Sequence, residues 1–144
     1  MEYRKFGDAY YIRMDRGDEM VSCVMEVCQR EGIASATYSG IGGCGAAELQ
    51  MFDPQKRAFS THRLEGLLEL IAFNGNVISD EGGARHTHTH ALFAYAEGNE
   101  NRTCGGHIKS ATVRYTAEIE LRPVLGGAIG YKLDPETGTG FWAL

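Results

Sequence analysis

Histidine residues gather in one short part of the chain. His86, His88 and His90 occupy alternate positions, and another follows in the segment Gly105-Gly106-His107. The sequence around the first three is typical of a β-strand, in which side chains repeat with a period of two, so all three are expected on one face. Imidazole is the commonest side-chain ligand for transition metals. This spacing predicts a metal site, with polar residues on a solvent-facing strand as the alternative.

Strand geometry restricts which histidines can share an ion. Same-face neighbours lie ~6.5–7 Å apart along a strand, so two imidazoles can converge on one ion with bonds of ~2.0–2.1 Å. The third ligand must come from a neighbouring strand, which His107 begins, and the two glycines before it let the backbones approach closely. Three neutral nitrogens with an open position are typical of a catalytic zinc site. We expect a divalent metal, zinc first, although iron, nickel and manganese accept the same ligands.

An open metal position can bind water and lower its pKa towards ~7. A hydrolase or lyase would also need an acid or base nearby. Glu69, Arg114 and Glu118 are candidates because they lie on strands that we expect to be adjacent. A residue of this kind is more often a plain charge on the face of a sheet. His62 is isolated in the sequence, and we interpret it as a surface residue.

The elements around these residues predict a single α+β domain of 144 residues. Only residues 18–31 have the one-sided periodicity of a long helix, with Asp18 as its N-cap and Gly32 after its end. Residues 108–121 alternate cleanly, which is typical of an antiparallel sheet, and their apolar face comprises Ala111, Val113, Tyr115, Ala117, Ile119 and Leu121. Further strands are expected at 10–14, 33–39, 58–62, 66–73 and through the histidines to about 95.

The predicted domain is a mostly antiparallel sheet crossed by one main helix. Its core covers about residues 8–123, and residues 124–144 form a tail whose apolar end, Phe141-Trp142-Ala143-Leu144, is expected to pack down. The segment Asn74-Gly75-Asn76 is expected to be a turn.

Residues 40–45 match the pattern G-x-G-x-x-G. A dinucleotide site needs a long helix directly after this loop, because the amides at the helix N-terminus hold the pyrophosphate. Here the next segment runs only to Asp53-Pro54. We therefore favour a tight glycine turn between two strands, with nucleotide binding as the alternative.

The composition excludes several other classes of protein. The net charge is −5 and no more than two basic residues are consecutive, which weighs against tight DNA binding, because phosphate neutralisation supplies most of that affinity. No apolar run approaches the ~20 residues of a membrane span, and the N-terminus has no apolar signal core. We expect a cytoplasmic protein without a membrane partner. The four cysteines form no C-x-x-C pair and are expected to be reduced.

Seven short motifs follow one another in a specific order, and with them the chain resembles the PPC (plants and prokaryotes conserved) domain family in its stand-alone prokaryotic form. The motifs are Arg16-Gly17-Asp18-Glu19, Glu31-Gly32-Ile33, Ser39-Gly40-Ile41-Gly42, Glu69-Leu70-Ile71-Ala72-Phe73-Asn74-Gly75-Asn76, His88-Thr89-His90, Gly105-Gly106-His107, and Ala111-Thr112-Val113 with Thr116-Ala117-Glu118. The resemblance implies an antiparallel sheet of about seven strands with a main helix, and assembly as a homotrimer.

The resemblance also bears on the histidines. The family pattern aligns with His88 and His90, whereas His86 falls on a usually apolar position and is an additional candidate ligand. The domain is similar in fold to acetolactate decarboxylase, whose metal is held by a comparable H-x-H plus His arrangement. This implies that His107 completes the site.

DNA binding is implied only by association. In land plants the domain follows AT-hooks, which are short Arg-Gly-Arg-Pro segments, but this chain contains none. The plant segment Gly-Arg-Phe-Glu-Ile-Leu, which is linked to partner binding, corresponds to residues 66–71, where Leu67 and Leu68 replace Arg and Phe; that interaction is not expected. Three hypotheses remain: a metal-containing DNA-binding or regulatory module, a metal-dependent hydrolase or lyase acting on a small polar substrate, and a trimeric scaffold.

Overall fold

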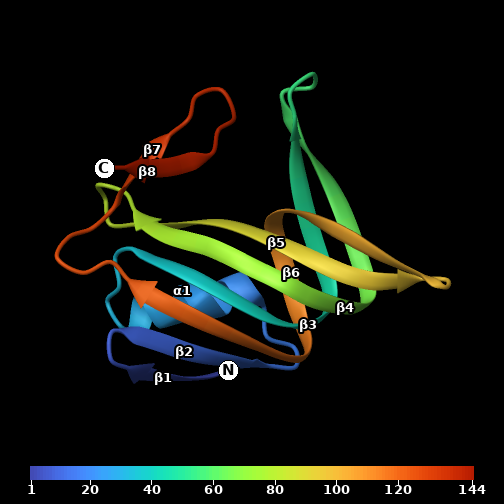
Figure 1. Ribbon diagram of the computed structural model, residues 1–144. Coiled ribbons are helices and arrows are strands. Elements are labelled where there is room, and N and C mark those ends of the chain that lie inside the picture. Colours follow the sequence, from blue (N-terminus) through green and yellow to red (C-terminus); the bar gives the residue numbers. More distant parts are fainter.

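A computed structural model describes residues 1–144 and contains eight strands and one helix (Figure 1). In chain order they are β1 (Glu2–Phe6), β2 (Ala9–Asp15), α1 (Met20–Arg30), β3 (Ala36–Asp53), β4 (Ala58–Ser79), β5 (Arg85–Glu97), β6 (Glu100–Pro123), β7 (Gly130–Leu133) and β8 (Gly140–Ala143). The predicted α+β class is confirmed, with eight strands instead of about seven. The structure contains no helix that is long and apolar enough to span a membrane.

One sheet contains all the strands, in the order β1-β2-β6-β3-β4-β7-β8, and β5 pairs with both β4 and β6. The four long strands β3 to β6 therefore close into a ring, because each pairs with two others. All pairs are antiparallel except a single bridge between β4 and β7. The β3–β4 and β5–β6 hairpins leave the common centre in different directions (Figure 1).

Helix α1 begins one residue later than the sequence suggested. Its N-cap is Glu19, whose carboxylate accepts from the amides of Val21 and Ser22, and not Asp18. At the other end Gly32 has φ +66°, and the amides of Gly32 and Ile33 donate to the carbonyls of Gln29 and Cys28, as in a Schellman cap. The buried face of the helix packs into a core formed with the sheet; it comprises Met20, Cys23, Val24, Val27 and Cys28.

The predicted glycine turn at residues 40–45 is wrong, because this segment lies inside β3. A Cβ added at Gly40 would clash with the Ile119 side chain and the Glu118 carbonyl oxygen, and one at Gly42 would lie 2.6 Å from the Cβ of Ala117. These glycines let β3 approach β6, and the strand register shifts beside them. No helix follows, so the geometry of a dinucleotide site is absent.

The shifted register also corrects the expected apolar face of β6. Gly42 pairs with Ala117 and Cys44 with Val113, so β6 carries more residues than β3 over this interval. Tyr115 lies in the extra segment and is 55% exposed, whereas the other five apolar residues of that face are buried. A bulge that turns one side chain outward cannot be read from alternation alone.

Three further expectations fail, the first two because pairing partners override local sequence. Residues 58–62, 66–73 and the predicted turn at 74–76 form one continuous strand, β4. A Cβ added at Gly75 would lie 2.5 Å from the Tyr38 ring and 2.8 Å from the His88 carbonyl oxygen, so this glycine serves a close approach. The apolar C-terminal end does not pack down: Phe141 and Trp142 are about 40% exposed on the separate β7–β8 hairpin, and Leu144 is fully exposed.

Candidate metal centre

Three histidines meet where β5 and β6 pair. His88 and His90 lie on β5, and His107 lies on β6 directly opposite His90. Their ring centroids are 5.2 Å apart for His88 and His90, 4.9 Å for His88 and His107, and 4.3 Å for His90 and His107. One ring nitrogen from each residue lies within 4.8 Å of the other two. The structure thus brings together the three residues that the sequence singled out.

The neighbouring residues explain why the rings converge. Thr89 is buried between the two histidines of β5, so these project from the opposite side of the strand. Cβ atoms at Gly105 and Gly106 would lie 2.9 Å from the Ala91 carbonyl oxygen and 2.8 Å from the Gln50 carbonyl oxygen. The two glycines therefore allow β6 to fit closely between β5 and β3 just before His107.

A buried hydrogen bond holds the histidine strand from its other side. The hydroxyl of Tyr38, on β3, is hydrogen-bonded to the hydroxyl of Thr89, and both residues are only 4% exposed. The Tyr38 ring reaches this position across Gly75, which has no side chain to obstruct it. This contact links β3 to the backbone between His88 and His90.

The electrostatics of the cluster favour neutral imidazoles. Burial, with a smaller contribution from His90, lowers the pKa of His88. Burial, followed by the charges of His90 and His88, lowers the pKa of His107. Neutral imidazole is the form that ligates a metal, so both residues are in their ligating form near neutral pH.

Two buried polar atoms beside the cluster have no partner within the protein. They are Nε2 of His88 and Oδ1 of Asn76, and the two residues are paired across β5 and β4. Buried polar groups are nearly always hydrogen-bonded or metal-bound. A single ion with bonds of ~2.0–2.1 Å spans up to ~4.2 Å between two ligands, so a small ring rotation would bring the three nitrogens onto one ion. The residues present fit a divalent metal.

His86 does not join the cluster. Its Nε2 lies 2.9 Å from a carboxylate oxygen of Asp80, and its ring stacks on Tyr131 of β7 at 4.3 Å. His86 shares a side of β5 with the other two histidines, as alternation predicts. Its ring nevertheless contacts a loop carboxylate and the C-terminal hairpin instead of the cluster. His62 is exposed, as expected.

A small cavity of about 170 Å³ adjoins two of the clustered histidines. Its lining is mainly polar and comprises Gln50, Phe59, Thr87, His88, Thr89, His107, Ile108, Thr139 and Gly140. None of Glu69, Arg114 and Glu118 lines it. Glu69 and Glu118 instead line a hollow of about 460 Å³ together with Ile41, Ile71 and Tyr115, and the backbone carbonyl of Arg114 accepts a hydrogen bond from Arg16.

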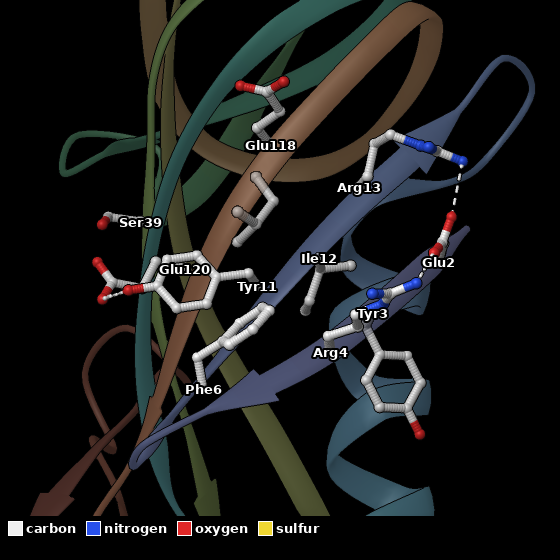
Figure 2. A pocket seen from close by; sticks show the side chains of 11 residues that line it. Glu2, Tyr3, Arg4, Phe6, Tyr11, Ile12, Arg13, Ser39, Glu118 and Glu120 are labelled. Carbon is white, nitrogen blue, oxygen red and sulfur yellow. Dashed lines mark hydrogen bonds and ion pairs between the residues drawn. The ribbon is translucent and has the colours of Figure 1, made fainter.

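A larger hollow of about 540 Å³ lies over β1, β2 and β6, away from the histidines. Figure 2 shows that most of its polar side chains bind one another: Arg13 and Arg4 both pair with Glu2, at 3.2 and 3.5 Å, and the Tyr11 hydroxyl donates to Glu120 at 3.2 Å. The Glu118 carboxylate also lines this hollow, and it has no ion-pair partner. The hollow contains no group of three metal-ligating side chains like that of the histidine cluster.

The fold and the ordered motifs together can be compared with known proteins. The model of the Plants and Prokaryotes Conserved (PCC) domain, the domain abbreviated PPC above, matches residues 1–124. The chain belongs to this family. A search of curated protein sequences found no match.

Several solved structures share this PPC fold. A PPC protein from Pyrococcus horikoshii is 27% identical, with 99% of this chain and 95% of that chain covered and a TM-score of 0.83. A metal-containing protein from Archaeoglobus fulgidus is 28% identical, with 99% and 97% covered and a TM-score of 0.82. A protein from Bacteroides thetaiotaomicron, described as a candidate DNA-binding protein, is 22% identical, with 99% and 96% covered and a TM-score of 0.88.

The expected likeness to acetolactate decarboxylase also has a structural counterpart. A Staphylococcus aureus protein described as similar to that enzyme has a TM-score of 0.57 at 12% identity, with 87% of this chain and 54% of that chain covered. This shows a distant relation in fold alone.

Sequence reasoning missed the residues that support the PPC histidine cluster. Asn76 falls in the segment that the sequence predicts to be a turn, and neither Tyr38 nor Thr89 carries a recognisable signal. The one usable hint was the glycine between Asn74 and Asn76, because a glycine inside a strand often marks a close approach. Tyr131, which stacks on His86, lies 45 residues beyond it in the sequence, and nothing local connects the two.

Proposed function

We propose that this PPC protein binds a divalent metal ion, zinc first, through His88, His90 and His107. The observation that carries the proposal is the meeting of three imidazoles from two strands, with ring nitrogens within 4.8 Å of one another. The lowered pKa values of two of them and the unpartnered Nε2 of His88 support it. The Archaeoglobus relative, described as a metal-containing protein, adds further support.

Metal analysis of the purified protein tests this proposal. Elemental mass spectrometry should find about one metal ion per chain in protein prepared without added metal, because three nitrogen ligands suffice for a zinc site. The double variant His88→Ala/His107→Ala should lose it. His62→Ala is the matched control, since His62 is exposed and outside the cluster. Equal and negligible metal in the wild type and the double variant would overturn the proposal.

The small cavity beside the histidines favours a second candidate function, a metal-dependent hydrolase or lyase acting on a small polar substrate. A bound divalent ion would supply Lewis-acid activation of water or of a substrate oxygen. The side chains of Gln50 and Thr139 could orient a polar molecule there. No carboxylate lines this cavity, so the protein itself would contribute orientation by amide and hydroxyl groups. Turnover of small esters or 2-oxo acids that is lost together with the metal would support this candidate.

We further propose that the chain assembles as a homotrimer, as its family resemblance implies. The hollow lined by Glu69 and Glu118 also exposes three large apolar side chains: Ile41 is 58% exposed, Ile71 51% and Tyr115 55%. A contiguous apolar surface of this kind is typical of a protein–protein interface. Light scattering should return about three times 15.8 kDa; the mass of a single chain would refute the trimer.

A DNA-binding or regulatory role is the remaining candidate, and the description of the Bacteroides relative supports it. The charge arrangement opposes tight binding: the net charge is −5, and Arg13, Arg63 and Arg102 each pair with a carboxylate. Binding to a mixed-sequence duplex at physiological salt should be no tighter than the ~10⁻⁴–10⁻⁶ M of non-specific complexes. Nanomolar affinity would establish the DNA-binding role instead.

A further inference from the structure

The C-terminal hairpin β7–β8 lies beside the histidine cluster, although it falls outside residues 1–124, which the family model matches. Figure 1 shows it as a separate red hairpin next to the ends of β4 and β5. Thr139 and Gly140 line the same cavity as His88 and His107. The hairpin thus forms part of the wall of the candidate metal centre.

The hairpin is braced by contacts within itself. The Asp134 carboxylate accepts from the amides of Glu136 and Thr137 and from the Thr137 hydroxyl, and the Asp134 amide donates to the Thr139 carbonyl at 2.8 Å. A Cβ added at Gly140 would clash with the Tyr131 ring, so the glycine lets that ring lie across the hairpin. Consequently the attachment of the whole hairpin to the rest of the chain sets the positions of Thr139 and Gly140.

Few contacts hold this unit to the rest of the molecule. One bridge joins Gly130 to Ser79, and the amide of Ile129 donates to the Ser35 hydroxyl at 3.0 Å. The only aromatic contact between the hairpin and the rest of the chain is the stack of Tyr131 on His86, with ring centroids 4.3 Å apart. Asp80 fixes His86 in turn. The other two aromatic side chains of the hairpin, Phe141 and Trp142, are about 40% exposed.

We propose that β7–β8 is a gate that restricts the histidine cluster to small polar ligands, and that the Tyr131–His86 stack is the latch that holds it in place. The cavity of about 170 Å³ has room for roughly five to six water molecules at ~30 Å³ each, which corresponds to a small carboxylate or a similar compact polar molecule. The inference rests on the proposed function only in that it takes the covered histidine cluster to be a metal site. Its first test needs no metal.

The first test measures how accessible the histidines are in the metal-free protein. Wild type, Tyr131→Ala, Tyr131→Phe and Phe141→Ala are treated with diethyl pyrocarbonate, and the modification rate of each histidine is followed by peptide mass spectrometry. Phe141→Ala is the matched control, because Phe141 is an aromatic residue on the same hairpin whose ring contacts Lys132 and not His86. Exposed His62 is the internal standard.

Tyr131→Ala should raise the modification rates of His88 and His107 about two- to tenfold, which is the range that an aromatic stack controls. Tyr131→Phe should keep the wild-type rates, because it keeps the ring, and Phe141→Ala should leave them unchanged. Unchanged melting temperatures show that the variants remain folded. Rates of His88 and His107 that are the same in Tyr131→Ala as in wild type would overturn the gate.

A second test uses the zinc-loaded protein and two chelators of different size. Tyr131→Ala should lose zinc faster to the bulky dye 4-(2-pyridylazo)resorcinol, by the same two- to tenfold, while its rate of loss to the compact ligand glycine stays close to wild type. Equal acceleration for both chelators would contradict size selection. A wild-type protein that takes up no zinc would overturn the proposed function, yet the reagent test on the metal-free protein would still decide the gate.

Discussion

The buried pair Tyr38–Thr89 should control both stability and the geometry of the histidine strand. Both hydroxyls are shielded from water, since each residue is 4% exposed, and they are hydrogen-bonded to each other. Burial raises the pKa of Tyr38, so the phenol stays protonated at any pH used for the protein. Tyr38→Phe removes the hydroxyl and leaves that of Thr89 buried without this partner.

Leaving a buried hydroxyl unpaired costs about 1–3 kcal/mol. For a chain of this length that corresponds to a fall in Tm of roughly 3–10 °C. Thr89→Val should cost a similar amount, because it leaves the Tyr38 hydroxyl unpaired instead. The double variant Tyr38→Phe/Thr89→Val should recover about 1–2 kcal/mol relative to the sum of the two single changes, because no unsatisfied group remains.

Thermal and urea unfolding at one fixed protein concentration measure these effects, since oligomers make Tm depend on concentration. Metal affinity is the second readout: because Thr89 lies between His88 and His90, Tyr38→Phe should weaken binding by no more than ~10-fold, at the lower limit of the 10–100-fold seen for direct partners of metal ligands. Strict additivity of the two single changes would refute the reasoning, because it would mean that the hydroxyls do not interact.

Three other results follow from the structure. Glu19→Ala should lower the unfolding free energy by ~1–3 kcal/mol, because the Glu19 carboxylate caps α1 and accepts from the Ala111 amide. Glu26→Ala, on the exposed side of the helix, should change the unfolding free energy by less than ~0.5 kcal/mol. Chemical denaturation measures both effects. Gly40→Ala should lower the unfolding free energy by ~3 kcal/mol or more, because the added methyl group meets the backbone of β6. Gly127 has open space around it, so Gly127→Ala should keep the unfolding free energy within ~1 kcal/mol of wild type. Equal effects of the two substitutions would contradict the close approach of β3 and β6. Metal affinity, measured by calorimetry over a pH series, should fall as acid protonates the histidines, and the lowered pKa values of the cluster should place the midpoint below the ordinary ~6.5; a midpoint above that value would contradict the burial argument.

Local sequence patterns were enough to identify the elements whose periodicity is strong. The start of the helix differs from the prediction by one residue, and its end at Gly32 is correct, because capping depends on neighbouring residues. The alternation of His88 and His90 was enough to put them on one side of a strand. A glycine pair before His107 was enough to suggest a close approach of the strand that carries it.

Other features depended on partners that are distant in sequence. The glycines at 40–45 and 74–76 read as turns, but they lie within strands because β6 and Tyr38 occupy the space that side chains would need. His86 has the same spacing as its neighbours, yet Asp80 and Tyr131 hold it apart from them. Asn76 has no local signal, and only strand pairing puts it opposite His88.

The sequence by itself therefore determined which residue types could bind a metal and on which side of a strand two of them lie. A period of two sets the direction of a side chain relative to its own strand. The tertiary structure alone decided that β5 and β6 pair with His90 opposite His107, that Tyr38 reaches Thr89, and that the C-terminal hairpin covers one side. Register and long-range packing decide which faces meet, and neither is encoded in any short stretch of the chain.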